Sequence, residues 1–220
     1  MIKLYYSPAS TAMGPHAALE EAGAEYELVE VDIDCPLEER DPEYLKINPH
    51  ARVPTLDDDG VIVYEGAAIM LYIAERFPHS DLAPPVGDRT RGLYLQWLVY
   101  MADTLQVAFQ MHYYPERHTT NIADLDNVKA KAAERLEEIW RVLNAGLQTG
   151  PYLLGERFSG CDLYLHMLTT WHQDPRALLD RFSNIKCCVE LVEKRPAVRR
   201  IMKVHGPSWV THHPDDIGPL

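Results

Sequence analysis

The chain has 220 residues and a formal net charge of −12, with 46% hydrophobic and 25% charged residues. This composition is ordinary for a globular protein of one or two domains. No basic stripe interrupts the acidic background, so we expect no nucleic-acid partner. The apolar runs are far shorter than a bilayer span, and the start of the chain has no signal-peptide pattern, so we expect no membrane partner.

The cysteines and histidines predict neither a disulfide nor a metal site. The four cysteines lack zinc-ligand spacing, and a bridge between the adjacent Cys187 and Cys188 would be strained. Free thiols are typical of a reducing compartment, so we expect a cytoplasmic protein. No two histidines lie four residues apart with an acid nearby on the same helix, and we expect no metal cofactor.

The first 78 residues predict a small sheet flanked by helices. Residues 2–6 and the alternating residues 27–33 are expected strands, joined by a helix over 14–22 that Gly23 ends. A short helix at 42–46, a hairpin around 55–63 and a helix from Glu65 to Phe77 follow. The order βαβ–ββα predicts a thioredoxin-like α/β domain over residues 1–78.

The rest of the chain predicts helices only. Residues 79–87 are proline-rich and are the expected linker, residues 88–205 form the expected all-α domain, and 206–220 form a tail. Helices are expected over 88–114 and 124–147, after Ser159, and over 185–194 and 197–205. Ser159 and Asp162 have the spacing of a capping box. In the first of these helices the expected buried face consists of Leu93, Trp97, Met101, Leu105 and Ala108.

Two places within residues 47–77 carry candidate chemistry. Val53-Pro54 stands where a strand should begin, and a cis bond there would leave the Val53 backbone free to pair with an extended ligand. Glu65-Gly66 opens a helix, whose free N–H groups attract a carboxylate while Glu65 attracts an ammonium. An amino-acid-like ligand matches both charges. The alternative is that Glu65 only complements the helix dipole.

These residues resemble a known family. The pattern Asn-Pro-x-x-x-Val-Pro-x-Leu, followed by Glu-Gly-x-x-Ile-x-x-Tyr-Ile, is similar to the glutathione-binding half of the glutathione transferases. The opening Lys-Leu-Tyr-Tyr-Ser-Pro and Pro15-His16 are similar to the bacterial beta class. The resemblance implies a detoxifying homodimer that takes glutathione as co-substrate and an apolar electrophile as second substrate. The implied glutathione contacts are Arg52, Val53, Pro54, Glu65, Gly66 and, from a partner subunit, Asp103.

The chain departs from the beta class at three positions. Thr11 stands where that class has a cysteine, Pro36 where it has a lysine, and Gln106 where it has a histidine. The resemblance therefore implies thiolate activation without the disulfide-forming chemistry of that class. Asp103 has the alternative of an ordinary solvated helix position.

The loop at 9–13 supplies the candidate catalytic groups, Ser10 and Thr11. A hydroxyl that donates to the glutathione sulfur would favour its thiolate. The alternative is that both residues only cap the following helix. Tyr6 is a third candidate donor, although its place within a strand favours a packing role.

Aromatic residues of the helical half are the candidates for the second-substrate pocket. They are Phe109, His112, Tyr113, Tyr114 and Trp171. Core or interface packing is the alternative for each of them. Two other functions stay open: a glutathione-dependent lyase, isomerase or dehalogenase, and a non-catalytic glutathione-binding protein.

Overall fold

The structure, a computed structural model, describes residues 1–206. It divides into two compact units, Met1–Pro85 together with the chain from Val192 onward, and Val86–Leu191. The expected tail at 206–220 lies outside the described residues except for Gly206.

The first unit is built on a four-stranded sheet in the order β2-β1-β3-β4. Its strands are β1 (Ile2–Tyr6), β2 (Tyr26–Glu30), β3 (Thr55–Asp58) and β4 (Val61–Tyr64). β1 is parallel to β2 and antiparallel to β3, and β3 is antiparallel to β4. Leu4 and Leu56 pair across the two central strands and are fully buried. The predicted thioredoxin-like sheet is thus confirmed.

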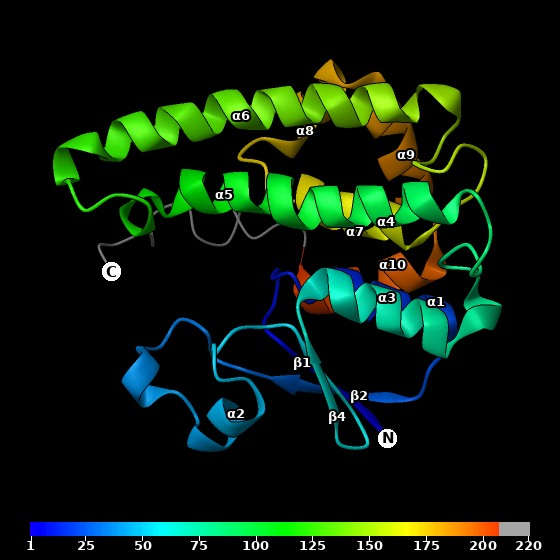
Figure 1. Cartoon of the computed structure of the whole chain (residues 1–220), viewed down its shortest axis with the longest axis horizontal. Helices are drawn as coiled ribbons and strands as arrows, with labels where there is room; N and C mark the ends of the chain where they lie inside the picture. The colour runs from blue at the N-terminus through cyan, green and yellow to red at the C-terminus, as the bar shows by residue number, and fades with distance from the viewer. Residues whose placement is uncertain (207–220) are drawn as a thin grey trace. The chain divides into compact units, whose positions relative to one another are not determined.

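Helices lie on both faces of this sheet (Figure 1). They are α1 (Met13–Ala22), α2 (Pro42–Ile47), α3 (Gly66–Arg76) and α10 (Pro196–His205). Side chains alternate between the faces of a strand. Tyr5 therefore faces Tyr44 of α2, with ring centroids 5.3 Å apart, whereas Tyr6 faces His205 of α10 at 5.6 Å. α1 packs against both α3 and α10.

Helix α10 belongs to the first unit. The sequence instead places all of residues 88–205 in the expected all-α domain. Its apolar residues Ala197, Val198 and Ile201 are buried. Arg195, just before the helix, donates two 2.7 Å hydrogen bonds to Glu21 of α1, and Arg200 pairs with Glu20. These arginines therefore tie α10 to α1 by ion pairs.

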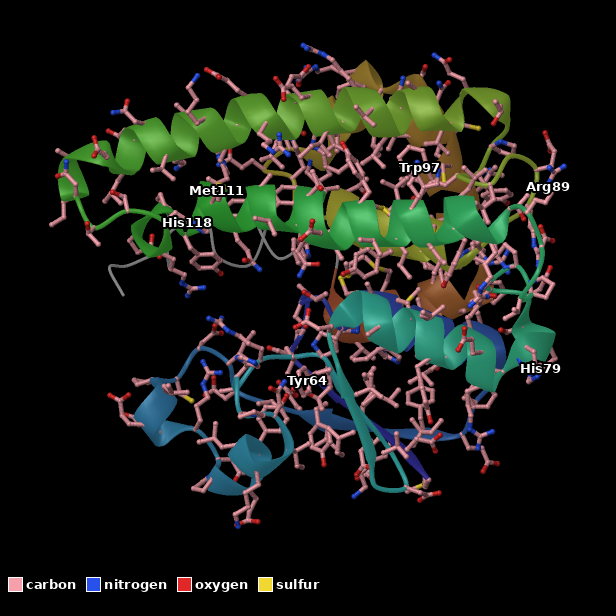
Figure 2. The ribbon with its side chains drawn as sticks, in the orientation of Figure 1. Tyr64, His79, Arg89, Trp97, Met111 and His118 are labelled. Carbon is pink, nitrogen blue, oxygen red and sulfur yellow. The ribbon has the colours of Figure 1, made fainter. Side chains whose placement is uncertain are left out.

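The second unit contains helices α4 (Arg91–Tyr100), α5 (Gln106–Tyr113), α6 (Leu125–Gly146), α7 (Gly160–Thr169) and α8 (Pro175–Arg181), and most of α9 (Ser183–Glu193). Helix α8 is absent from the sequence prediction. Trp97 of α4, labelled in Figure 2, packs against Gly146 of α6, where an added Cβ would lie 2.5 Å from the indole. A larger residue at 146 would therefore require the indole to shift.

A π-helical turn at Met101–Leu105 joins α4 to α5. Tyr94 and Leu98 are buried before the turn, Met101 and Leu105 within it, and Phe109 after it. The prediction that Leu93 belongs to the buried face is wrong, because Leu93 is 47% exposed. The buried residues Tyr94, Leu98, Met101, Leu105 and Ala108 follow steps of four, three, four and three residues, whereas the predicted face used two steps of four from Leu93 to Met101.

The predicted capping box at the start of α7 is confirmed. The Ser159 hydroxyl accepts from the Cys161 N–H at 3.3 Å, and Asp162 Oδ2 accepts from the Ser159 N–H at 2.8 Å. Asp162 Oδ1 also accepts from the Leu153 N–H, so the box ties the preceding loop to the helix. Among residues 1–206, no helix combines the length and apolar character that a membrane span requires.

Candidate active site

The loop between β1 and α1 holds Ser10 and Thr11. Ser10 Oγ donates to the Ser7 carbonyl at 2.6 Å and accepts from the Ala12 N–H at 3.2 Å. The only hydroxyl hydrogen of Ser10 is therefore used inside the loop. Thr11 is 9% exposed. α1 begins at Met13 without a side-chain cap, the Met13 N–H donates to the Ser10 carbonyl at 3.1 Å, and Pro15 has no N–H.

The Val53-Pro54 peptide bond is cis, and a buried polar cluster fixes the backbone just before it. The Arg52 carbonyl accepts from the Tyr44 hydroxyl and from Asn48 Nδ2, the latter at 2.9 Å. The Tyr44 hydroxyl and Asn48 Nδ2 each also lie 2.9 Å from Thr55 Oγ1. Pro54 is buried, Val53 is half-buried and the Arg52 side chain is exposed. The backbone of Val53 is thus held from the side of α2.

The junction between β4 and α3 places Glu65 in a rarely occupied backbone conformation. Glu65 has φ of +79° and ψ of 115°, and its side chain is exposed without capping the helix. A residue other than glycine persists in such a conformation only where its surroundings enforce it, which is a property of functional sites. Gly66 follows as the first helical residue. Free N–H groups and an exposed carboxylate therefore lie side by side.

The strand register brings these three segments to one end of the sheet. Tyr5 near the end of β1 pairs with Thr55 at the start of β3, and Thr55 pairs with Tyr64 at the end of β4. The Ser10 loop follows β1, the Val53 turn precedes β3, and Glu65 follows Tyr64, which Figure 2 labels. Residues more than fifty positions apart in the chain therefore form one candidate site within the first unit.

The other candidates belong to the second unit. Asp103 is exposed within the π turn. Phe109 stacks on Tyr113 and meets the edge of Trp171, each with centroids 5.9 Å apart. The Tyr113 hydroxyl donates to the Trp171 carbonyl, and burial raises the pKa of Tyr113.

His112 and Tyr114 flank this aromatic cluster differently. His112 lies against Tyr113 at 5.1 Å, and burial lowers the pKa of His112. Tyr114 is covered by Arg117, whose guanidinium carbon lies 4.0 Å from the ring centroid. Phe109 is only 2% exposed and so takes the core-packing alternative. Gln106, at the position of the beta-class histidine, accepts from the Tyr164 hydroxyl at 2.8 Å.

Some polar residues of the first unit escaped the sequence prediction. Tyr44 and Asn48 support the Val53 turn, and His16 and His205 form a buried pair behind the Ser10 loop, with ring nitrogens 3.0 Å apart. The only sequence signal for them is the family-like context of Asn48-Pro49 and Pro15-His16. Within residues 1–206 no group of three or more histidine, cysteine or acidic side chains is placed to hold a metal ion.

A thioredoxin-like unit with a polar site at one end of its sheet, followed by a helical unit, is the architecture that the comparisons with known proteins match. The family described as glutathione S-transferase, N-terminal domain, matches residues 1–75, and its C-terminal domain matches residues 102–203. Glutathione S-transferase GstA of Escherichia coli O157:H7 is 29% identical over 93% of this chain and 99% of its own length. The GST-like protein YncG of Escherichia coli K12 is 31% identical over 92% and 98%.

Solved structures agree with these relatives. BphK, a bacterial glutathione transferase solved as a ternary complex, is 32% identical with a TM-score of 0.80, over 93% of this chain and 99% of its own. A Sulfitobacter homologue with bound glutathione is 28% identical with a TM-score of 0.83, over 93% and 98%. The chain belongs to the glutathione S-transferase family, a family of transferases, and its fold is that of the family.

Proposed function

We propose that the protein binds glutathione at the end of its sheet and activates the thiol for attack on an apolar electrophilic carbon. The observation that carries the proposal is the meeting of the Ser10 loop, the Val53 turn and Glu65-Gly66 at that end. The backbone of the half-buried Val53 suits the cysteinyl backbone of an extended tripeptide. The start of α3 suits a carboxylate, and Glu65 suits the γ-glutamyl ammonium. Glutathione bound to the Sulfitobacter homologue supports the same ligand here.

We assign the activation of the glutathione thiol to the loop between β1 and α1. A free thiol has a pKa of about 8.5 and is mostly protonated at neutral pH. A hydrogen bond donated to the sulfur and the positive end of the α1 dipole both favour the thiolate. We assign the donor to the two hydroxyl residues of this loop, Ser10 and Thr11; Ser10, which donates to the Ser7 carbonyl at 2.6 Å, would exchange that partner for the sulfur. The thiol proton leaves to solvent, the new carbon–sulfur bond forms, and the leaving group departs with its electron pair.

The second substrate, a homodimer and a cytoplasmic location complete the proposal. We assign the apolar substrate to the surface around His112, Tyr113, Tyr114 and Trp171. Leu95, Val99 and Val107 are exposed apolar residues at four- and eight-residue spacing on the α4–α5 face that carries Asp103. A partner copy that covers this stripe would bring its own Asp103 with it. All four cysteines are free, as in a reducing compartment.

The test of this function is glutathione binding followed by thiolate absorbance and product analysis. We expect Glu65→Gln to weaken glutathione binding at least about tenfold, or 1.4 kcal/mol, because the ammonium loses its only assigned charge partner in this chain. Glu75→Gln removes the same charge from the far end of α3 and is the matched control. Equal affinities of the two variants in calorimetry would contradict the assignment. Consumption of glutathione by chlorodinitrobenzene separates conjugation from isomerisation, which regenerates glutathione.

A further inference from the structure

Two buried histidines lie behind the Ser10 loop, outside the candidate site itself. His16 of α1 is 2% exposed and His205 of α10 is 1% exposed. His16 Nδ1 lies 3.0 Å from His205 Nε2. His205 Nδ1 is on the opposite side of its ring and accepts from the Ala9 N–H at 3.2 Å. One imidazole from α10 therefore reaches the backbone of the loop that carries Ser10 and Thr11.

The hydrogen-bond partners fix the tautomer of both rings. A backbone N–H only donates, so His205 Nδ1 must be unprotonated and neutral His205 carries its hydrogen on Nε2. That hydrogen is donated to His16 Nδ1, and His16 therefore carries its own hydrogen on Nε2. His16 Nε2 lies 2.8 Å from the Tyr26 oxygen, and the Tyr26 hydroxyl donates to Glu20. All four bonds run in one direction, from the Ala9 amide to a carboxylate.

The surroundings keep both rings neutral. The groups that face the pair are the Tyr6 ring from β1, Tyr26 from β2, and Glu20 from α1, which is paired with Arg200 of α10. No carboxylate contacts either imidazole directly within the described residues. Burial lowers the pKa of His16 to about 4 and that of His205 to about 3. At neutral pH His205 Nδ1 is therefore an acceptor.

The Ala9 backbone needs such an anchor. Ala9 has φ of +54°, a left-handed conformation that costs a non-glycine residue roughly 1–2 kcal/mol. Ala9 is buried and directly precedes Ser10. Its N–H is held by His205, and the loop is closed on the other side by the Ser10–Ser7 hydrogen bond. These two hydrogen bonds fix the backbone of the loop and with it the direction in which the Ser10 and Thr11 side chains extend.

We propose that His205 is a positioning residue for the thiol-activating loop: it holds the Ala9 amide and so fixes the place of the loop that carries Ser10 and Thr11 relative to the sulfur of bound glutathione. His16, Tyr26 and Glu20 hold His205 in the tautomer that this task requires. The inference rests on the proposed function, since it gives the loop its purpose. His205 itself touches no substrate.

Two substitutions of His205 distinguish the hydrogen bond that Nδ1 accepts from Ala9 from the one that Nε2 donates to His16. The oxygen of asparagine occupies the place of Nδ1, so His205→Asn keeps an acceptor for Ala9 and loses the bond to His16. The amide nitrogen of glutamine occupies the place of Nε2, so His205→Gln keeps a donor to His16 and loses the acceptor for Ala9. Both variants lose an imidazole, and a purely structural role for His205 would affect both alike.

The readout is the ultraviolet thiolate absorbance of glutathione bound to each protein as a function of pH. We expect His205→Gln to raise the pKa of the bound thiol by about 1, a tenfold loss of thiolate at a given pH. His205→Asn should stay within about threefold of the unsubstituted protein, or roughly 0.7 kcal/mol. Glutathione affinity should change little in either variant, because Val53 and Glu65 are untouched. Equal thiol pKa values in the two variants would overturn the proposal.

Two further measurements decide the matter independently of thiol activation. If the unsubstituted protein binds glutathione without a thiolate signal, the proposed function fails. Hydrogen exchange of the Ala9 amide then tests the hydrogen bond between Ala9 and His205 by itself. Faster exchange in His205→Gln than in His205→Asn supports the anchor, and equal exchange refutes it. If a variant does not fold, nitrogen NMR of the unsubstituted protein applies. A hydrogen on His205 Nδ1 would overturn the inference, and the Nε2–H tautomer would support it.

Discussion

The burial of His16 makes a quantitative prediction about stability in acid. Burial lowers the pKa of His16 in the folded protein to about 4, whereas an unfolded histidine has a pKa of about 6.5. Between these values the unfolded chain binds more protons, so the free energy of unfolding falls as the pH drops. Above about pH 7 the contribution is fully present.

The size of the effect follows from the difference between the two pKa values. A difference of about 2.5 corresponds to about 3 kcal/mol of unfolding free energy lost between pH 7 and pH 4. For a chain of this length that is a fall in Tm of roughly 6–12 °C. His205 acts in the same direction, because burial and the neighbouring His16 lower its pKa as well.

The assay compares urea unfolding at several pH values in three proteins at one fixed concentration. His16→Gln keeps a donor toward Tyr26 but cannot be protonated, so it should lose about 3 kcal/mol less than the unsubstituted protein between pH 7 and pH 4. Carboxylates titrate in both proteins and cancel in this difference. His118→Gln removes an exposed histidine (Figure 2) and is the matched control. Parallel acid profiles for His16→Gln and the unsubstituted protein would refute the reasoning.

Two further predictions concern the Val53 turn and the stripe on α4. Tyr44→Phe removes one of two donors to the Arg52 carbonyl; we expect a loss of about 1 kcal/mol in unfolding free energy and several-fold weaker glutathione binding by calorimetry. Unchanged affinity would mean that the cluster does not position the turn. Val99→Glu places a charge in the exposed apolar stripe, and we expect sedimentation to show at least about a tenfold weaker dimer, or 1.4 kcal/mol. Glu substituted for the exposed Val86 is the control, and equal dimer affinities would exclude the stripe as the interface.

Local signals in the sequence are sufficient for much of this fold. The capping box joins residues only three positions apart, and Gly23 ends α1 in the left-handed conformation expected of a C-cap, so both were readable from neighbours. Helix α8 has comparable signals, since Asp174 accepts from the Ala177 N–H and Pro175 is its first residue. These are the same signals that mark α2, where Asp41 is the cap and Pro42 the first residue, so α8 could have been predicted in the same way.

Long-range pairing accounts for what the sequence could not provide. The hydrogen bond between Ala9 and His205 spans 196 positions of the chain, and nothing near either residue indicates the other. The buried face of α4 was misassigned at Leu93 because apolar or aromatic residues stand at Leu93, Tyr94, Leu95, Trp97 and Leu98 alike, so the local pattern allows more than one face. Of the candidate site, the Val53 turn and Glu65 could be predicted because the resemblance names them. Their supports, Tyr44 and Asn48, depend on how α2 meets the sheet.

The first unit is assembled from both flanks of the helical unit in the chain, and this has a consequence for its synthesis. Translation delivers the sheet and α1 first, then more than a hundred residues of the second unit, and only afterwards α10. Until α10 emerges, the α1 glutamates lack their arginines and Ala9 lacks its anchor. The nascent chain can therefore form its sheet early, as amino-terminal domains generally do, but the loop that carries Ser10 and Thr11 gains its anchor only after α10 has left the ribosome.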